Sequence, residues 1–260
     1  MSMDKPLRHL RDWRGQRVWI TGASSGIGRA LAVRLAQQGA TVFASARNRE
    51  ALMALEREAG VHALPCDVTD RASMLGVAET IRARAGALDV LIANAGTCEY
   101  VDVRAFDSAL FARVFATNFA GVVHTVEAAL PLLRAGNARW LAGVGSSAAW
   151  NGLPRAEAYG ASKAALHYLL DSLRVDLTRE HFRVTTIAPG FVETPLTDRN
   201  DFAMPMRIGV EEAVDRILDG FAAGRDAIDF PPAFVAALKL LSLLPVSLRN
   251  RLLQRTLRTA

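Results

Sequence analysis

The feature that most constrains the fold of this chain is a regular alternation of short β-rich runs with longer helical runs. The first helical run carries Ile27, Leu31 and Leu35 at helical spacing. Strands that alternate with helices need crossover connections, and such connections build a parallel sheet with helices on both faces. The sequence therefore predicts a doubly wound α/β fold, in which ligands bind beyond the carboxyl ends of the strands.

The expected elements divide the chain into one domain and a tail. Strands are expected at residues 17–21, 41–46, 61–64, 90–93, 140–144, 183–188 and 227–230. Helices are expected at residues 26–38, 48–59, 71–84, 108–133, 159–178 and 210–222. No linker or repeat precedes Pro231, so residues 1–230 form the predicted domain and residues 231–260 a C-terminal helical extension.

Composition excludes several classes of protein. The chain has 260 residues, of which 51% are hydrophobic and 22% charged, as in ordinary globular proteins. Two cysteines, Cys66 and Cys98, are too few for a disulfide framework, and the five histidines lack metal-ligand spacing. The first residues contain no apolar core of signal-peptide length. We therefore expect a cytoplasmic protein without a bound metal.

The net charge of +5 is located at the C-terminus. From Phe230 to the end the chain has five basic residues and no acidic one, which leaves 26 basic and 26 acidic residues elsewhere. A nucleic-acid-binding domain would more often carry its own basic patch. We therefore expect no nucleic-acid partner.

A glycine-rich turn follows the first expected strand, with the sequence Thr21-Gly22-Ala23-Ser24-Ser25-Gly26-Ile27-Gly28. Glycines at such a turn let the backbone approach a pyrophosphate, and the following helix offers free N–H groups and the positive end of its dipole. The spacing T-G-x-x-x-G-x-G resembles that of the short-chain dehydrogenase/reductase family. The resemblance implies a Rossmann-like sheet, here of about seven strands, and a nicotinamide cofactor.

Other motifs support this resemblance over residues 16–230. Asp67 follows the third expected strand, where the family has an aspartate that meets the adenine. Residues 94–96 match the family's N-A-G, and residues 189–194 match its P-G-x-V-x-T, which holds the nicotinamide amide. The resemblance implies a cofactor site formed by Gly22, Ser24, Ser25, Gly26, Ile27, Gly28, Arg47, Asp67, Val68, Asn94, Ala95, Gly96, Tyr159, Lys163, Pro189, Gly190, Val192 and Thr194.

The resemblance also implies a catalytic tetrad of Asn118, Ser146, Tyr159 and Lys163. A helix places Tyr159 and Lys163, four residues apart, on one face, and the ammonium favours the phenolate. Tyr159 would move a proton to or from the substrate oxygen while the nicotinamide moves a hydride, and Lys163 would also hold the nicotinamide ribose. Asn118 would hold a water that relays protons to Lys163.

Two adjacent serines compete for the position of the catalytic serine. The spacing to Tyr159 favours Ser146, whereas the position within the Ser-Ser pair favours Ser147. We choose Ser146, whose hydroxyl would hydrogen-bond and orient the substrate oxygen.

The end of the second expected strand predicts the cofactor. An acidic residue there would bind the ribose 2′-hydroxyl of NAD, but this chain has Ala46, then Arg47, with Arg49 close by. A guanidinium can bind a 2′-phosphate through charge-assisted bonds. The sequence therefore predicts NADP(H); the alternative is that Arg47 is merely solvated.

The segments after the fourth, fifth and sixth expected strands line the substrate pocket in the family. Here they offer an apolar and aromatic set: Cys98, Tyr100, Ala148, Trp150, Leu153, Phe191, Phe202, Met204 and Met206. This set predicts a lipophilic ketone or secondary alcohol as substrate and a mobile lid near residues 197–206. The alternatives are a carrier-linked 3-oxoacyl thioester reductase and a catalytically idle NADPH sensor.

Two patterns predict contacts with other molecules. Phe111, Phe115, Phe119 and Val123 recur four apart, which favours a homodimer or homotetramer built on the long helices, as in proteins of this family.

In the tail, a largely apolar segment at residues 233–248 precedes residues with leucines and arginines on opposite halves of a helical wheel. We expect the tail either to lie on an anionic membrane surface or to fold back over the pocket or dimer interface.

Overall fold

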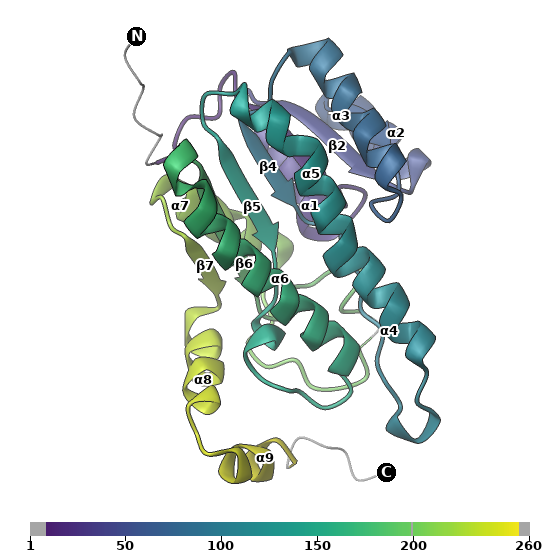
Figure 1. Cartoon of the computed structure of the whole chain (residues 1–260), viewed down its shortest axis with the longest axis vertical. Helices are drawn as coiled ribbons and strands as arrows, with labels where there is room; N and C mark the ends of the chain where they lie inside the picture. The colour runs from purple at the N-terminus through teal and green to yellow at the C-terminus, as the bar shows by residue number, and fades with distance from the viewer. Residues whose placement is uncertain (1–8, 199, 255–260) are drawn as a thin grey trace.

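The computed structural model describes residues 9–198 and 200–254. Its seven parallel strands form one sheet in the order β3-β2-β1-β4-β5-β6-β7 (Figure 1). The strands are β1 (Arg17–Thr21), β2 (Thr41–Ala46), β3 (His62–Pro65), β4 (Val90–Ala93), β5 (Trp140–Val144), β6 (Arg183–Pro189) and β7 (Ala227–Phe230). The strand order reverses between β1 and β4, which confirms the predicted doubly wound, Rossmann-like sheet.

Helices cover both faces of the sheet (Figure 1). The helices of the domain are α1 (Gly26–Gln37), α2 (Arg49–Ala59), α3 (Arg71–Ala85), α4 (Ser108–Phe115), α5 (Gly121–Arg134), α6 (Glu157–Asp176) and α7 (Val210–Ala222). Val18 and Ile20 pack in the core shared with α1, α2 and α7, whereas Trp19 packs in the core shared with α3, α5 and α6. This alternation follows from the side-chain period of two in a strand.

The long helix expected at residues 108–133 is interrupted. A π-helical turn, Ala116–Ala120, separates α4 from α5 and contains Asn118. By length and composition alone, Ser108–Arg134 could span a membrane. In the fold, however, α5 packs Val122, Val126 and Leu132 into the core beneath the sheet.

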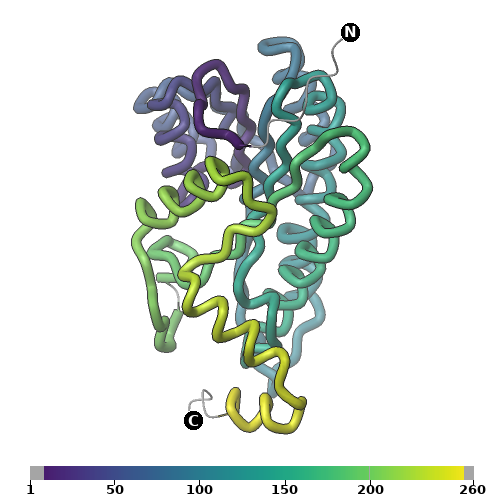
Figure 2. Tube along the Cα trace, turned by 90° about the vertical axis from the view of Figure 1, so that its left-hand side faces the viewer, coloured from purple at the N-terminus to yellow at the C-terminus, as the bar shows by residue number. Residues whose placement is uncertain are grey.

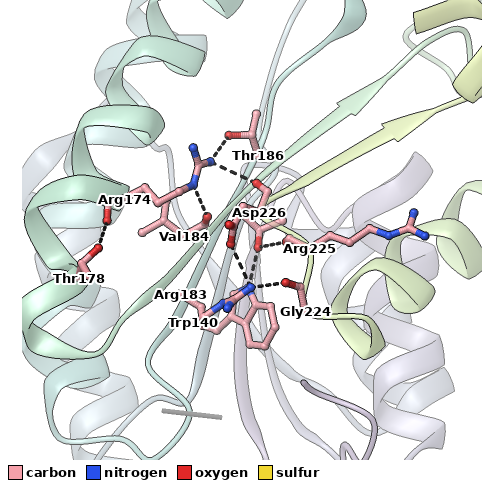
Figure 3. Close-up of polar contacts among 10 residues, drawn as sticks. Trp140, Arg174, Thr178, Arg183, Val184, Thr186, Gly224, Arg225 and Asp226 are labelled. Carbon is pink, nitrogen blue, oxygen red and sulfur yellow. Dashed lines mark hydrogen bonds and ion pairs between the residues drawn. The ribbon is translucent and has the colours of Figure 1, made fainter. Parts of the chain in front are cut away.

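Two arginines fix the last strand of the sheet (Figure 3). Arg174 of α6 donates a hydrogen bond to the Asp226 carbonyl at 3.1 Å and further bonds to two groups of β6. Arg183 of β6 lies over the Trp140 ring, donates to the Gly224 carbonyl and pairs with the Asp226 carboxylate. Together these contacts hold the segment just before β7 against β6, the neighbouring strand.

The tail forms two helices, α8 (Pro232–Ser242) and α9 (Val246–Gln254), beyond the carboxyl end of β7 (Figures 1 and 2). Helix α8 packs on β7 and on a short 3-10 helix, Ser147–Trp150, and it buries Val235 and Leu238. The Asn151 amide donates to the Leu238 carbonyl at 2.7 Å. The last residues of the predicted amphipathic pattern, Arg255, Leu257 and Arg258, lie outside the described residues.

Candidate active site

The glycine-rich turn between β1 and α1 has no room for side chains at two positions. Gly22 has a φ of +68°, and a Cβ there would lie 2.7 Å from the Ala95 Cα. A Cβ on Gly28 would lie 2.4 Å from the Asn94 Nδ2. Ser25 precedes α1 without a side-chain cap, so its hydroxyl does not occupy the helix N-terminus. The turn thus presents backbone N–H groups, as binding of a pyrophosphate requires.

The Asn-Ala-Gly segment after β4 locks this turn in place. The Asn94 amide donates to the carbonyls of Thr21 and Gly22 at 3.0 and 3.2 Å. The Thr21 hydroxyl in turn accepts from the backbone N–H groups of Asn94 and Ala95, both at 3.1 Å. The motif therefore joins the ends of β1 and β4, at the point where the strand order reverses.

A cavity of about 620 Å³ lies at the carboxyl ends of the strands. Every residue that the sequence assigned to the cofactor lines it except Gly28, which packs behind the turn. Asp67 also helps to shape the loop after β3, because its Oδ1 accepts from the Thr69 N–H at 2.9 Å. One continuous cavity thus reaches from the end of β2 to α6.

Arg47 stands at the β2 end of this cavity. Its side chain is exposed and lines the cavity, and it makes no ion pair with any residue in the described ranges. Arg49 is exposed too but does not line the cavity. No acidic side chain takes the position at the end of β2, where Ala46 is buried.

Tyr159, Lys163 and Ser146 line the other end of the cavity. Tyr159 lies in the first turn of α6 and Lys163 one turn later, with the Lys163 Nζ 5.9 Å from the centre of the phenol ring. The ammonium donates to the Val144 carbonyl at 2.8 Å. Ser147 is buried and is not part of the cavity lining. The geometry thus favours Ser146 over its neighbour.

An aromatic row borders this end of the site. The ring centroids of Tyr100 and Phe202 lie 5.5 Å apart, those of Phe202 and Phe191 lie 6.0 Å apart, and those of Phe191 and Phe234 of α8 lie 5.6 Å apart. Phe202 lies on the loop between Val192 and Ile208, and these two residues pair in an isolated parallel β-bridge. None of the nine residues expected in the substrate pocket lines the main cavity; three of them build this row instead.

The family model described as short chain dehydrogenase matches residues 16–203. The chain belongs to the short-chain dehydrogenase/reductase family. An uncharacterized oxidoreductase of Myxococcus xanthus is 38% identical over 231 residues, which cover 87% of this chain and 91% of the relative. The enzyme is thus an NAD(P)-dependent oxidoreductase that acts on a small-molecule substrate.

Two solved structures resemble the enzyme in fold. The Pseudomonas aeruginosa RhlG/NADP complex has a TM-score of 0.76 at 27% identity, covering 87% of this chain and 99% of that one. A short-chain dehydrogenase/reductase from Burkholderia phymatum in complex with NAD has a TM-score of 0.80 at 25% identity, covering 89% of this chain and 94% of that one. The two neighbours therefore bind different nicotinamide cofactors.

Burial shifts the pKa values of the Tyr159 phenol and the Lys163 ammonium in opposite directions. Burial raises the pKa of Tyr159 to about 12, and the hydrogen bond with Ser146 lowers it by a smaller amount. Burial also lowers the pKa of Lys163 to about 8. The sequence led us to expect a phenolate stabilised by the ammonium. In this structure burial acts in the opposite direction and raises the pKa of the phenol.

Asn118 joins the loop after β4 to α6. Its buried amide accepts from the Thr97 N–H at 2.8 Å and donates to the Thr97 carbonyl at 2.9 Å and to the Ser162 hydroxyl at 3.0 Å. Asn118 Oδ1 and Lys163 Nζ both approach Gly96, each 3.4 Å from where a Cβ would lie. The asparagine thus lies next to the lysine, and the water relay between them stays a prediction.

His167 lies behind Ser146, although the sequence pattern assigned it no role. Its Nε2 accepts the backbone N–H of Ser146 at 3.4 Å, and its ring packs edge-on against Trp150. Burial, and next the charge of Lys163, lower the pKa of His167 to about 4, so the imidazole is neutral and can accept. A Cβ on Gly145 would lie 2.1 Å from this nitrogen. The sequence could have indicated this position, because His167 follows Lys163 by four residues and therefore lies on the same face of the helix.

Proposed function

We propose that the enzyme is an NADP(H)-dependent oxidoreductase that interconverts a lipophilic ketone and the corresponding secondary alcohol, with Tyr159 as general acid/base. The observation that carries this proposal is one cavity with Arg47 at one end, whose guanidinium makes no ion pair with any described residue. Tyr159, Lys163 and Ser146 lie at the other end. A dinucleotide that fills such a cavity has its adenosine ribose near the arginine and its nicotinamide near the phenol.

The residues of the cavity fit a phosphorylated dinucleotide. Gly22 and the N-terminus of α1 would hold the pyrophosphate, because a Cβ on Gly22 would clash and the Ser25 hydroxyl leaves the helix end uncapped. Arg47 would hold the 2′-phosphate, for which it has no competing carboxylate among the described residues. Asp67 would meet the adenine. When bound, the nicotinamide supplies or accepts the hydride.

The enzyme's own residues would handle the proton. In the reduction direction, the protonated phenol of Tyr159 gives its proton to the carbonyl oxygen. Ser146 orients that oxygen with its hydroxyl. Lys163 holds the nicotinamide ribose and, with Asn118, delivers a replacement proton to Tyr159. Because burial raises the pKa of Tyr159 above its ordinary value, the phenol would carry its proton when the ketone binds.

The border of the catalytic end supports a lipophilic substrate. The aromatic row offers the ring faces of Tyr100, Phe202 and Phe191. The Tyr100 hydroxyl donates a hydrogen bond to the Asn200 side-chain oxygen. The nearby Arg155 pairs with Asp201. The Arg155 guanidinium beside this row is therefore neutralised by a carboxylate and is not free to clamp a small acid, which favours a ketone without a carboxylate.

Tyr159→Phe tests the assignment of the acid. The variant should lower kcat by about 10²- to 10⁴-fold, because it removes the proton donor. The Kd for NADPH should change little, since the other end of the cavity supplies most of the binding. Tyr168→Phe is the matched control, because Tyr168 lies on the same helix with 78% of its surface exposed. NADPH oxidation with a panel of aliphatic and aromatic ketones is the assay.

The same panel separates the alternatives. Activity of Tyr159→Phe within about tenfold of the wild-type value would contradict the role of the phenol. Turnover of carrier-linked 3-oxoacyl thioesters without turnover of free ketones would favour the carrier-linked reductase. NADPH binding without turnover of any substrate would favour the sensor.

We also propose that the enzyme is a cytoplasmic homodimer or homotetramer. Val123 on α5 is 38% exposed, and Val175 on α6 is 73% exposed. Phe111, Phe115 and Phe119 are only partly covered. Apolar side chains on the outer faces of these two helices support an interface between copies of the chain.

A further inference from the structure

Exposed apolar side chains gather on the tail. Among the described residues, thirteen large apolar side chains are exposed, and five of them lie within residues 231–254: Leu240, Leu243, Val246, Leu248 and Leu252. Leu243 is the most exposed of these, at 79%. Single exposed leucines are ordinary, but a run of them on one short segment marks a surface that contacts something apolar.

Helix α8 is apolar on two opposite faces. Val235 and Leu238 are buried against the domain. Ala236, Leu240 and Leu243 follow one another at spacings of four and three residues and are all exposed. A surface helix of a globular protein normally turns polar side chains outward, whereas the outer face of α8 is apolar and no described residue covers it.

The charges beside this face indicate the chemistry of its partner. Residues 231–260 contain no acidic side chain, and α9 carries two arginines among its exposed leucines. Arg251 is exposed, whereas Arg249 is half-buried and donates to the Ser242 carbonyl at 3.4 Å, a contact that it would exchange for a headgroup. The remainder of the chain is nearly neutral. A second copy paired face to face through its tail would bring these arginines together without a compensating carboxylate. An anionic lipid surface offers both an apolar layer and negative headgroups.

We propose that α8 and α9 lie on an anionic membrane surface, with the outer leucines in the interfacial layer and Arg249 and Arg251 against the headgroups. The inner face of α8 places Phe234 against Phe191, so the tail borders the catalytic end of the cavity. The membrane would then present a lipophilic substrate beside that end. This last step rests on the proposed function, whereas the surface itself does not.

Vesicle sedimentation of the full-length chain tests the apolar contact. The wild-type protein should co-sediment with phosphatidylserine/phosphatidylcholine vesicles, and added salt should weaken the binding. Leu240→Glu with Leu243→Glu should abolish it, because two carboxylates cannot enter the interface beside anionic lipid. Met53→Glu is the matched control: Met53 is 45% exposed on α2, away from the tail, and its replacement should leave binding unchanged.

Replacing the arginines tests the charge contact separately. Arg249→Gln with Arg251→Gln should weaken binding to the anionic vesicles by about fivefold for each charge removed. Binding to pure phosphatidylcholine should not change with these substitutions. All variants should retain wild-type turnover of a water-soluble ketone, because none of the substituted side chains lines the cavity.

Two results would overturn the proposal. In the first, the full-length protein ignores anionic vesicles, or the leucine variant binds them as well as the wild type. In the second, the leucine variant dissociates an oligomer in the absence of lipid, which would identify a second copy as the partner. Because sedimentation does not depend on turnover, an inactive enzyme that still binds vesicles would refute the proposed function and not the lipid surface.

Discussion

Replacing Arg47 by aspartate should change the cofactor preference of the enzyme. Arg47 is the exposed cation at the β2 end of the cavity, and Ala46 before it leaves the usual acidic position empty of charge. The substitution removes the partner proposed for the 2′-phosphate. It also places a carboxylate one residue after the usual acidic position, where it could accept a hydrogen bond from a ribose 2′-hydroxyl.

The size of the effect follows from the exposure of Arg47. A hydrogen bond to a charged group contributes about 1.5–3 kcal/mol, and solvent screening at an exposed side chain favours the lower end. The new carboxylate adds a repulsion of about 1 kcal/mol at 4 Å in water. The sum is about 2.5 kcal/mol, which corresponds to a roughly 70-fold change in the NADP-to-NAD ratio of kcat/KM.

The assay is the kcat/KM for NADPH and NADH with one ketone at fixed ionic strength. Arg49→Asp is the matched control, because Arg49 is also exposed and lies two residues away but does not line the cavity. An unchanged ratio in Arg47→Asp would show that this arginine is only solvated. Equal shifts in the two variants would show a long-range effect of net charge instead of a phosphate contact.

Two further predictions concern stability and assembly. Asp89 accepts hydrogen bonds from Arg17 and Asn137; burial raises its pKa, but these bonds outweigh burial and the pKa is lowered. The stability that Asp89 contributes is therefore present above its unfolded pKa of about 3.9 and lost as pH falls through the folded value. Asp89→Asn should cost about 3 kcal/mol at pH 7, and urea titrations should show less acid sensitivity than in the wild type. Sedimentation velocity at micromolar concentration should give a species at least twice the 28.1 kDa of the chain; a monomer would refute the interface on α5 and α6.

Short-range patterns were enough to predict most of this fold. The strand at residues 17–21 has its predicted bounds because its alternate side chains enter two cores, Val18 on one side and Trp19 on the other. Parallel strands also place their carboxyl ends at one edge of the sheet. For that reason, motifs as distant in sequence as Gly22 and Tyr159 could be assigned to one cavity before the fold was known.

Features that depend on contacts across elements could not be predicted in the same way. The π-helical turn at Asn118 interrupts the single helix expected at residues 108–133, and the Asn118 amide bonds to Thr97, which follows a different strand. His167 enters the site only because Gly145 of another segment leaves space for its ring. The pKa of Tyr159 depends on burial by the whole cleft, whereas the sequence showed only the neighbouring lysine.

The two interpretations of the tail, folding back over the domain and lying on a membrane surface, concern different faces of one helix. Folding back over the domain uses the inner face of α8, and contact with lipid uses the outer face. Lys239 connects the inner face to the active site: its ammonium pairs with Asp229 and lies 4.5 Å over the Trp150 ring, which packs against the His167 that accepts the Ser146 N–H. Removing the tail after residue 230 would disturb the packing behind that serine as well as any membrane contact. Only substitutions on the outer face can separate the two roles.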